Sequence, residues 1–216
     1  MIRAYQWDVP GIRVHSPGEK EVVVVLTGLT VTGGVGASPG LLIAGIARVT
    51  IANCTISENG WRGGIELESS AQARIEGCTV SGNNFGIWLR ESSQATIEGC
   101  TVSANGCGIW LVGSPQAMIT DCAISENERD GIMLDQSAQA TMKNNEIFGN
   151  GGCGISLAER PCVDTEHAFT GRVTGCGNTI PGPDEPDGNK SGAVCPDAVA
   201  FLMAREGGEL DRRPAP

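Results

Sequence analysis

The chain has 216 residues, of which 31 are glycine, about 14% and roughly twice the usual share. Aromatic residues make up 4%, charged residues 19% and apolar residues 40%, and the formal net charge at pH 7 is −10. This composition disfavours a helical bundle but provides enough apolar residues for a sizeable core. The acidic charge argues against nucleic acid and anionic membranes as partners. No apolar run reaches the ~20 residues of a membrane helix, so no membrane insertion is expected.

Residues 1–20 precede an internal repeat and are predicted to form a first turn with a polar outer face. The repeat begins faintly near Val24 and is plain from Val49 onward. Two copies follow each other without a gap, ARIEGCTVSGNNFGIWLRESSQ (73–94) and ATIEGCTVSANGCGIWLVGSPQ (95–116). Equivalent positions in successive copies lie 22–25 residues apart. A fixed repeat of this length predicts a solenoid.

Apolar and polar residues alternate within each copy, which predicts β-strands. In the copy that starts at Ala73, the residues predicted to point inward are Ala73, Ile75, Cys78, Val80, Ile87 and Leu89. One copy cannot bury its apolar side alone, so copies are expected to stack at the strand spacing of ~4.8 Å. The sequence therefore predicts an all-β, single-stranded parallel β-helix of six to seven rungs over residues 1–157.

Two columns of repeated residues are expected to stabilise the stack. The first is an asparagine column at one turn, Asn59, Asn83, Asn105, Asn127 and Asn150. A buried amide there can hydrogen-bond the amides above and below it, while simple turn formation is the alternative. The second, five residues earlier in each copy, holds Cys54, Cys78, Cys100 and Cys122. These thiols are interpreted as small buried apolar groups, because a line of sulfurs does not make a tetrahedral metal site.

Residues 158–216 depart from the repeat and are predicted to close the C-terminal end. Arg172–Ile180 is expected to form a last partial rung, and residues 181–192 a turn-rich loop. A capping helix is predicted over 197–208 and a disordered tail over 211–216. A disulfide between Cys162 and Cys195 is expected to tie this cap, which would suit an oxidising compartment.

The repeat resembles the right-handed parallel β-helix repeat of the pectate-lyase-like superfamily, over about residues 22–157. This resemblance implies right-handedness but no single activity, because the superfamily includes lyases, hydrolases, epimerases and adhesins. Its lyases and hydrolases place Asp, Arg or Lys groups on one outward sheet inside a cleft. No outward column of this sequence is expected to combine paired carboxylates with a basic partner.

An aromatic patch is the preferred candidate site. Trp88 and Trp110 occupy the outward slot of adjacent Gly-Ile-x-Leu strands, with Glu66 before them and Met133 after. Phe85 and Trp61 lie on the neighbouring turn, where nearly all variation in repeat length falls. Exposed aromatic patches normally mark interaction sites. A sugar-stacking platform, a subunit contact and a surface covered by the C-terminal segment all remain open.

A calcium site is the second candidate. Glu76 and Glu98 would stack one strand spacing apart with Asp121 nearby, and like charges so close invite a cation. A solvated surface is the simpler interpretation and the favoured one, so no cofactor is expected.

These observations favour a non-catalytic extracytoplasmic module that binds carbohydrate or acts as a scaffold. One alternative is a carbohydrate-active enzyme of the polysaccharide lyase or epimerase type. The other is a purely structural or self-assembling solenoid, and the chain could act as a monomer or as a homo-oligomer through a solenoid face.

Overall fold

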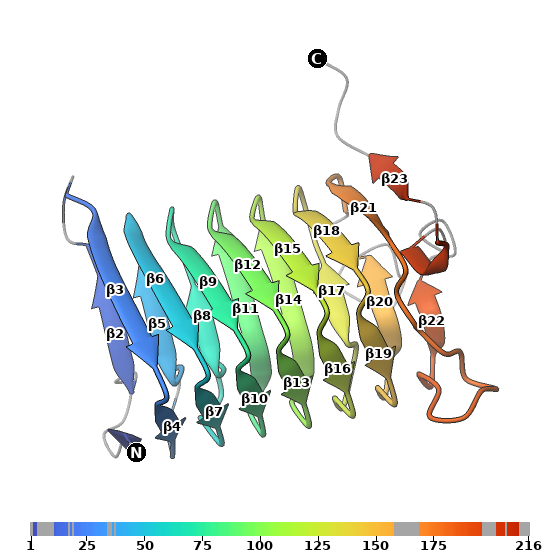
Figure 1. Cartoon of the computed structure of the whole chain (residues 1–216), viewed down its shortest axis with the longest axis horizontal. Helices are drawn as coiled ribbons and strands as arrows, with labels where there is room; N and C mark the ends of the chain where they lie inside the picture. The colour runs from blue at the N-terminus through green and yellow to red at the C-terminus, as the bar shows by residue number, and fades with distance from the viewer. Residues whose placement is uncertain are drawn as a thin grey trace.

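The computed structural model describes residues 2–3, 11–16, 18, 20–33, 36, 38–157, 169–195, 202–205 and 207–211. These residues are almost entirely β-structure and form a parallel solenoid of about six turns (Figure 1). Each turn passes through three sheets, which we call sheets A, B and C, and each strand pairs with its equivalent in the next turn. The predicted all-β parallel solenoid with non-repetitive ends is confirmed. The proposed division at residue 157 stays a prediction.

The three sheets contain 23 strands in total. Sheet A consists of β1 (Ile2–Arg3), β4 (Thr30–Thr32), β7 (Thr55–Ser57), β10 (Thr79–Ser81), β13 (Thr101–Ser103), β16 (Ala123–Ser125) and β19 (Glu146–Phe148). Sheet B consists of β2 (Ile12–His15), β5 (Leu41–Ala44), β8 (Ile65–Leu67), β11 (Phe85–Glu91), β14 (Cys107–Gly113), β17 (Ile132–Leu134), β20 (Cys153–Leu157) and β22 (Gly192–Cys195). Sheet C consists of β3 (Val22–Thr27), β6 (Ala47–Ala52), β9 (Gln72–Glu76), β12 (Gln94–Glu98), β15 (Gln116–Thr120), β18 (Gln139–Lys143), β21 (Arg172–Cys176) and β23 (Gly208–Asp211).

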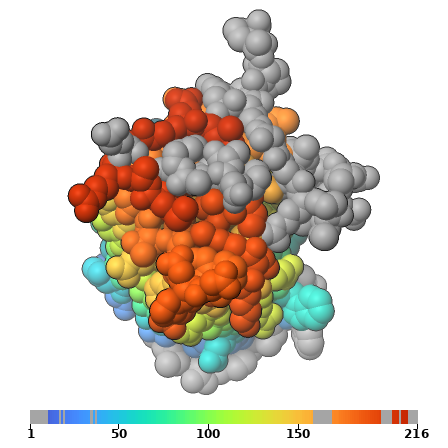
Figure 2. Space-filling view, turned by 90° about the vertical axis from the view of Figure 1, so that its right-hand side faces the viewer, coloured from blue at the N-terminus to red at the C-terminus, as the bar shows by residue number. Residues whose placement is uncertain are grey.

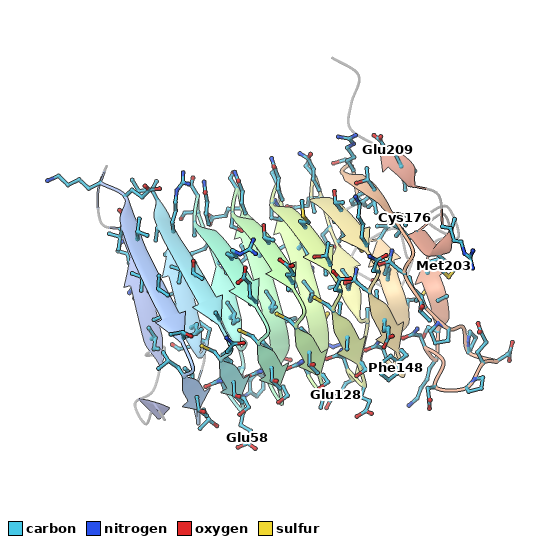
Figure 3. The ribbon with its side chains drawn as sticks, in the orientation of Figure 1. Glu58, Glu128, Phe148, Cys176, Met203 and Glu209 are labelled. Atoms are coloured by element: carbon cyan, nitrogen blue, oxygen red, sulfur yellow. A yellow bond between two sulfur atoms is a disulfide. The ribbon has the colours of Figure 1, made fainter. Side chains whose placement is uncertain are left out.

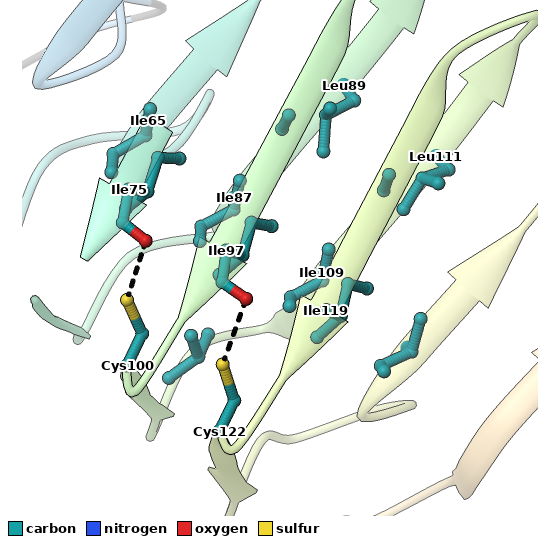
Figure 4. Packing of buried hydrophobic residues seen from close by; sticks show 14 of the residues in the cluster. Ile65, Ile75, Ile87, Leu89, Ile97, Cys100, Ile109, Leu111, Ile119 and Cys122 are labelled. Carbon is teal, nitrogen blue, oxygen red and sulfur yellow. Dashed lines mark hydrogen bonds between the residues drawn. The ribbon is translucent and has the colours of Figure 1, made fainter. Parts of the chain in front are cut away.

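The core is a set of columns of identical or similar residues that run along the solenoid (Figure 4). Ile75, Ile97 and Ile119 of sheet C are fully buried and face the similarly buried isoleucines and leucines of sheet B. Burying each such side chain stabilises the fold by about 1.5–3 kcal/mol. The thiols of Cys100 and Cys122 donate to the carbonyls of Ile75 and Ile97 at 3.5 and 3.6 Å. The inward positions predicted from alternation are all buried.

The two sharp corners on either side of sheet A redirect the chain, and both use a residue with positive φ. Between sheets C and A this residue is Asn53, Gly77, Gly99, Asp121 or Asn144, with φ of 53–59°. Between sheets A and B it is Glu58, Gly82, Ala104, Glu126 or Gly149, with φ of 54–66°. Asn, Asp and Gly tolerate this left-handed conformation, but Ala104 and the two glutamates are strained there.

The asparagine column lies at the corner between sheets A and B and is completely buried. Asn83 Nδ2 donates to Asn105 Oδ1 at 3.0 Å, and Asn105 Nδ2 donates to Asn127 Oδ1 at 3.1 Å. Each Oδ1 also accepts the backbone N–H of the preceding asparagine, as in the 3.0 Å bond from Asn83 to Asn105. The run continues past the sequence repeat, because Asn150 Nδ2 donates to Asn189 Oδ1 at 2.8 Å.

The C-terminal end is closed by segments that lie outside the regular repeat. Figure 2, which looks onto this end, shows the segment after residue 169 spread across the last turns. β22 pairs in parallel with β20, and this brings the Cα atoms of Cys153 and Cys195 to 6.3 Å in a disulfide. The expected partner of Cys195 is therefore wrong: Cys195 bonds Cys153, and Cys162 lies outside the described residues. The mistake arose because sequence separation does not reveal that β22 adds to sheet B.

The predicted capping helix over 197–208 is also corrected where the structure describes it. Leu202–Met203 form a short 3₁₀ turn, and Gly208, expected to end the helix, instead begins β23. β23 pairs antiparallel with β21, so it covers the end of sheet C. Figure 3 shows Met203 near Cys176 of β21 and Glu209 on β23. Of the predicted disordered tail, Asp211 is part of β23 and the remainder lies outside the described residues.

Candidate functional site

The candidate site lies on the outer face of sheet B, where successive outward residues are aligned by strand register. This column holds Leu42, Glu66, Trp88, Trp110, Met133, Ser156 and Cys195. The predicted stacking of Trp88 directly on Trp110, between Glu66 and Met133, is therefore present in the register. We call this column and its immediate neighbours the sheet B face.

The aromatic residues of the sheet B face form one compact cluster. The rings of Trp88 and Trp110 are stacked, with centroids 5.1 Å apart and planes within 1°. Phe85 lies 5.0 Å from each of them, and the Arg90 guanidinium lies 4.6 Å from the Trp88 ring centroid. The rings are half-buried and much of their faces is already covered, so the cluster is not the open platform that the sequence suggested.

Trp61 stands apart from this cluster. It lies on the turn between β7 and β8 and is 81% exposed. Among the described residues it makes no ring contact with Phe85, Trp88 or Trp110. The same turn also carries Arg62, which points back to the sheet B face.

A buried carboxylate lies beside the Trp88 ring. Glu66 is fully buried, and its Oε1 atom lies 3.1 Å from Arg90 Nη1 and 3.5 Å from Arg62 Nη1. Burial raises the pKa of the Glu66 carboxyl above its ordinary value, although both arginines oppose this shift. Its second oxygen, Oε2, is buried and has no hydrogen-bond partner among the described residues. The Trp88 indole Nε1 is in the same situation.

Two aspartates lie at the other end of the cluster. Asp135 Oδ2 accepts the Trp110 indole N–H at 2.7 Å. Asp130 accepts the Ser156 hydroxyl at 2.7 Å and the Cys153 backbone N–H at 2.6 Å. Burial, helped by the charge of Asp130, raises the pKa of the Cys107 thiol to about 12, so this thiol stays protonated. The sheet B face thus combines aromatic rings with carboxylates at both ends.

Sequence reasoning missed Arg90, Asp130 and Asp135 as members of the site. It also expected no outward column to combine paired carboxylates with a basic partner; Arg90 lies 3.1 Å from Glu66 and 3.8 Å from Glu68, which belong to two neighbouring outward columns. A signal was available, because Arg90 and Asp135 follow Trp88 and Met133 by two residues and therefore share their face. The burial of Glu66 carried no sequence signal.

At the predicted calcium site, the structure pairs the glutamate carboxylates with an arginine. Glu76 and Glu98 are outward on sheet C, and Arg74 makes an ion pair with both, at 3.1 Å from Glu98. The guanidinium therefore occupies the position between the carboxylates that a cation would need. Asp121 is the exposed residue of a corner, with φ of 53°. Within the described part of the chain, no three His, Cys, Asp or Glu side chains converge as metal ligands.

The fold and this face define a β-solenoid with an aromatic and acidic surface. The chain belongs to the family described as the right-handed β-helix region, whose sequence profile matches residues 25–171. No curated protein sequence matches the chain. The chain is similar in structure to a mutant of the periplasmic alginate epimerase AlgG, with a TM-score of 0.69 and 16% identity. The match covers 87% of this chain and 45% of that chain, and at this identity it supports the right-handed fold alone. No helix among the described residues is long and apolar enough to cross a membrane.

Proposed function

We propose that the sheet B face binds a carbohydrate and that the chain acts as a recognition module. The observation that carries this proposal is the pair of unpartnered polar atoms beside the aromatic cluster, Trp88 Nε1 and Glu66 Oε2. An indole N–H donates a hydrogen bond and a carboxylate oxygen accepts one. Neighbouring sugar hydroxyls supply both complements, and sugar C–H groups pack against aromatic carbon. Small side-chain movements of Arg90 and Phe85 would be needed to admit them.

The charges around the cluster favour a neutral saccharide. Arg62 and Arg90 are already engaged with Glu66, and Arg90 also lies near Glu68. An acidic polysaccharide would have to compete with these carboxylates and with a net charge of −10. A neutral saccharide neither competes with these carboxylates nor is repelled by the net charge.

An extracytoplasmic location is part of the same proposal. The Cys153–Cys195 disulfide is typical of an oxidising compartment. The structurally similar epimerase is periplasmic, which is consistent with such a location.

The proposal is tested by a glycan-array screen of the parent and of a Trp88→Ala/Trp110→Ala variant. We expect binding of a neutral saccharide by the parent and a loss of about 30-fold or more in the variant, as for a central aromatic anchor. Trp61→Ala is the matched control, because Trp61 is exposed outside the cluster. No neutral ligand on the array, or equal loss in the control, would contradict the proposal.

Catalysis on the same face is the second candidate, favoured by Glu66. A buried carboxyl with a raised pKa is suited to proton transfer, and Arg62 and Arg90 beside it could engage a substrate carboxylate. Lyase and epimerase reactions on uronic acids both require removal of a proton next to a carboxylate. Incubation with a polyuronate, followed by NMR of the polymer, tests this class. Activity that disappears in Glu66→Gln would favour the enzyme over the binding module.

A further inference from the structure

A second surface, the outer face of sheet C, carries a shallow trough of about 650 Å³ that runs along the solenoid axis. Its floor is the strand backbone at four in-register positions whose side chains point into the core, Ala73, Ala95, Ala117 and Ala140. The outward residues on either side of each alanine form the two walls. The width of the trough is therefore the distance between residues i and i+2 of one strand. A trough of this width accommodates one extended polymer chain.

One wall is a ladder of glutamines with an arginine at each end. The register aligns Arg48, Gln72, Gln94, Gln116, Gln139 and Arg172 on six successive strands of sheet C. Among the described residues, none of these four glutamine amides hydrogen-bonds to the protein. Each amide offers two donors and one acceptor to the trough. The opposite wall includes Thr50, Thr96 and Met118, the last 49% exposed.

The charges in the trough are balanced within the protein. Arg48 pairs with Glu21, Arg74 lies 3.1 Å from Glu98, and Arg172 lies 2.6 Å from Glu209 on β23 (Figure 3). A polyanion would have to break these pairs, and a polycation would meet three arginines. Neutral amides and hydroxyls at regular spacing instead match a neutral polymer with hydroxyls in every unit.

We propose that the sheet C trough binds a linear neutral polysaccharide that lies along the solenoid axis. Successive glutamines are one strand spacing apart, about 4.8 Å. This is comparable to the advance per sugar of an extended hexose or pentose chain, so each rung can address one sugar. The trough is distinct from the sheet B face, on a different sheet of the solenoid, and it binds whether or not the sheet B face does.

The test is titration calorimetry with neutral linear hexasaccharides of β-1,4-glucan, β-1,4-xylan and β-1,4-mannan. The variant Gln94→Ala/Gln116→Ala removes two central amides, and we expect its affinity for the bound hexasaccharide to fall by about tenfold or more. The control Ser81→Ala/Ser103→Ala removes an in-register outward pair from sheet A, outside the trough, and should bind like the parent. For the parent, affinity should rise with oligosaccharide length and level off near six sugars, because six rungs form the wall.

Three results would overturn the proposal. The first is that none of the three hexasaccharides binds, and the second is that the glutamine variant binds a hexasaccharide as tightly as the parent does. The third is that the parent binds a hexauronate or an extended peptide instead and that the glutamine variant loses this binding. The Trp88→Ala/Trp110→Ala variant separates the two sites. If the tryptophan variant abolishes binding of a hexasaccharide and the glutamine variant does not, that binding belongs to the sheet B face and contradicts the proposed trough site.

Discussion

The asparagines at the corner between sheets A and B show how one residue type connects neighbouring rungs. Asn105 Nδ2 donates to both Asn127 Oδ1 and the Val80 carbonyl, and its Oδ1 accepts from the side chain and backbone of Asn83. All of these groups are buried, so they have no water to replace a lost partner.

Asn105→Leu should therefore lower the free energy of unfolding by about 2–4 kcal/mol, because it leaves several buried polar groups without partners. Urea denaturation of the parent and variant measures this difference. Thr101→Leu, an exposed change in the same rung, is the control and should stay within about 0.5 kcal/mol of the parent. An Asn105→Leu variant as stable as the parent would refute this role of the column.

At the same scale, sequence reasoning identified the asparagines and the buried cysteines but not the charge arrangement. Fixed spacing was enough to place Asn59 through Asn150 in one column. It could not show that Glu66 is buried or that Arg90 reaches it, because these depend on side-chain direction and on the shape of the neighbouring turn. Asn189 was missed for a similar reason, since 39 residues separate it from Asn150.

At the scale of the element, each corner between sheets A and B depends on one residue with positive φ. Gly82 and Ala104 occupy the same corner in adjacent rungs, with φ of 66° and 54°. Glycine has no steric penalty in this conformation, whereas alanine is strained by about 1–2 kcal/mol. The two positions therefore offer a matched pair of opposite substitutions.

Ala104→Gly should raise the free energy of unfolding by up to about 1 kcal/mol, since the relieved strain exceeds the added freedom of the unfolded chain. Gly82→Ala should lower it by a similar amount, and its new Cβ would meet Glu58 only at 3.4 Å or more, an ordinary contact. Thermal unfolding of the two variants measures both effects. If the two changes shift stability in the same direction, strain at this corner is not the cause.

The strands themselves were predicted more fully than their ends. Period-two alternation located the strand pattern in each copy, because each rung repeats the same burial pattern. Neither the pairing of β22 with β20 nor the antiparallel addition of β23 follows from a repeat, since both segments lie outside it. For this reason the disulfide partner and the capping helix were predicted incorrectly.

At the scale of the whole molecule, the solenoid presents three faces with different chemistry. Sheet A shows short strands with hydroxyl residues, sheet B an aromatic and acidic cluster, and sheet C an amide-lined trough. Stacking turns one repeated position into a continuous column, so a binding surface grows with the number of rungs. The sheet B cluster spans only a few rungs, while the trough spans most of the solenoid. We expect the first to recognise a short saccharide and the second an extended chain.

NMR of the tryptophan indole N–H signals is the most direct test of saccharide binding at the sheet B face. The signals would be assigned with single Trp→Phe variants and followed during titration with the neutral saccharide that binds best on the array. We predict a large shift of the Trp88 signal, because its unpartnered Nε1 gains an acceptor, a smaller shift of the Trp110 signal, and none for Trp61. Saturable binding that leaves the Trp88 and Trp110 signals unmoved would contradict the proposed site.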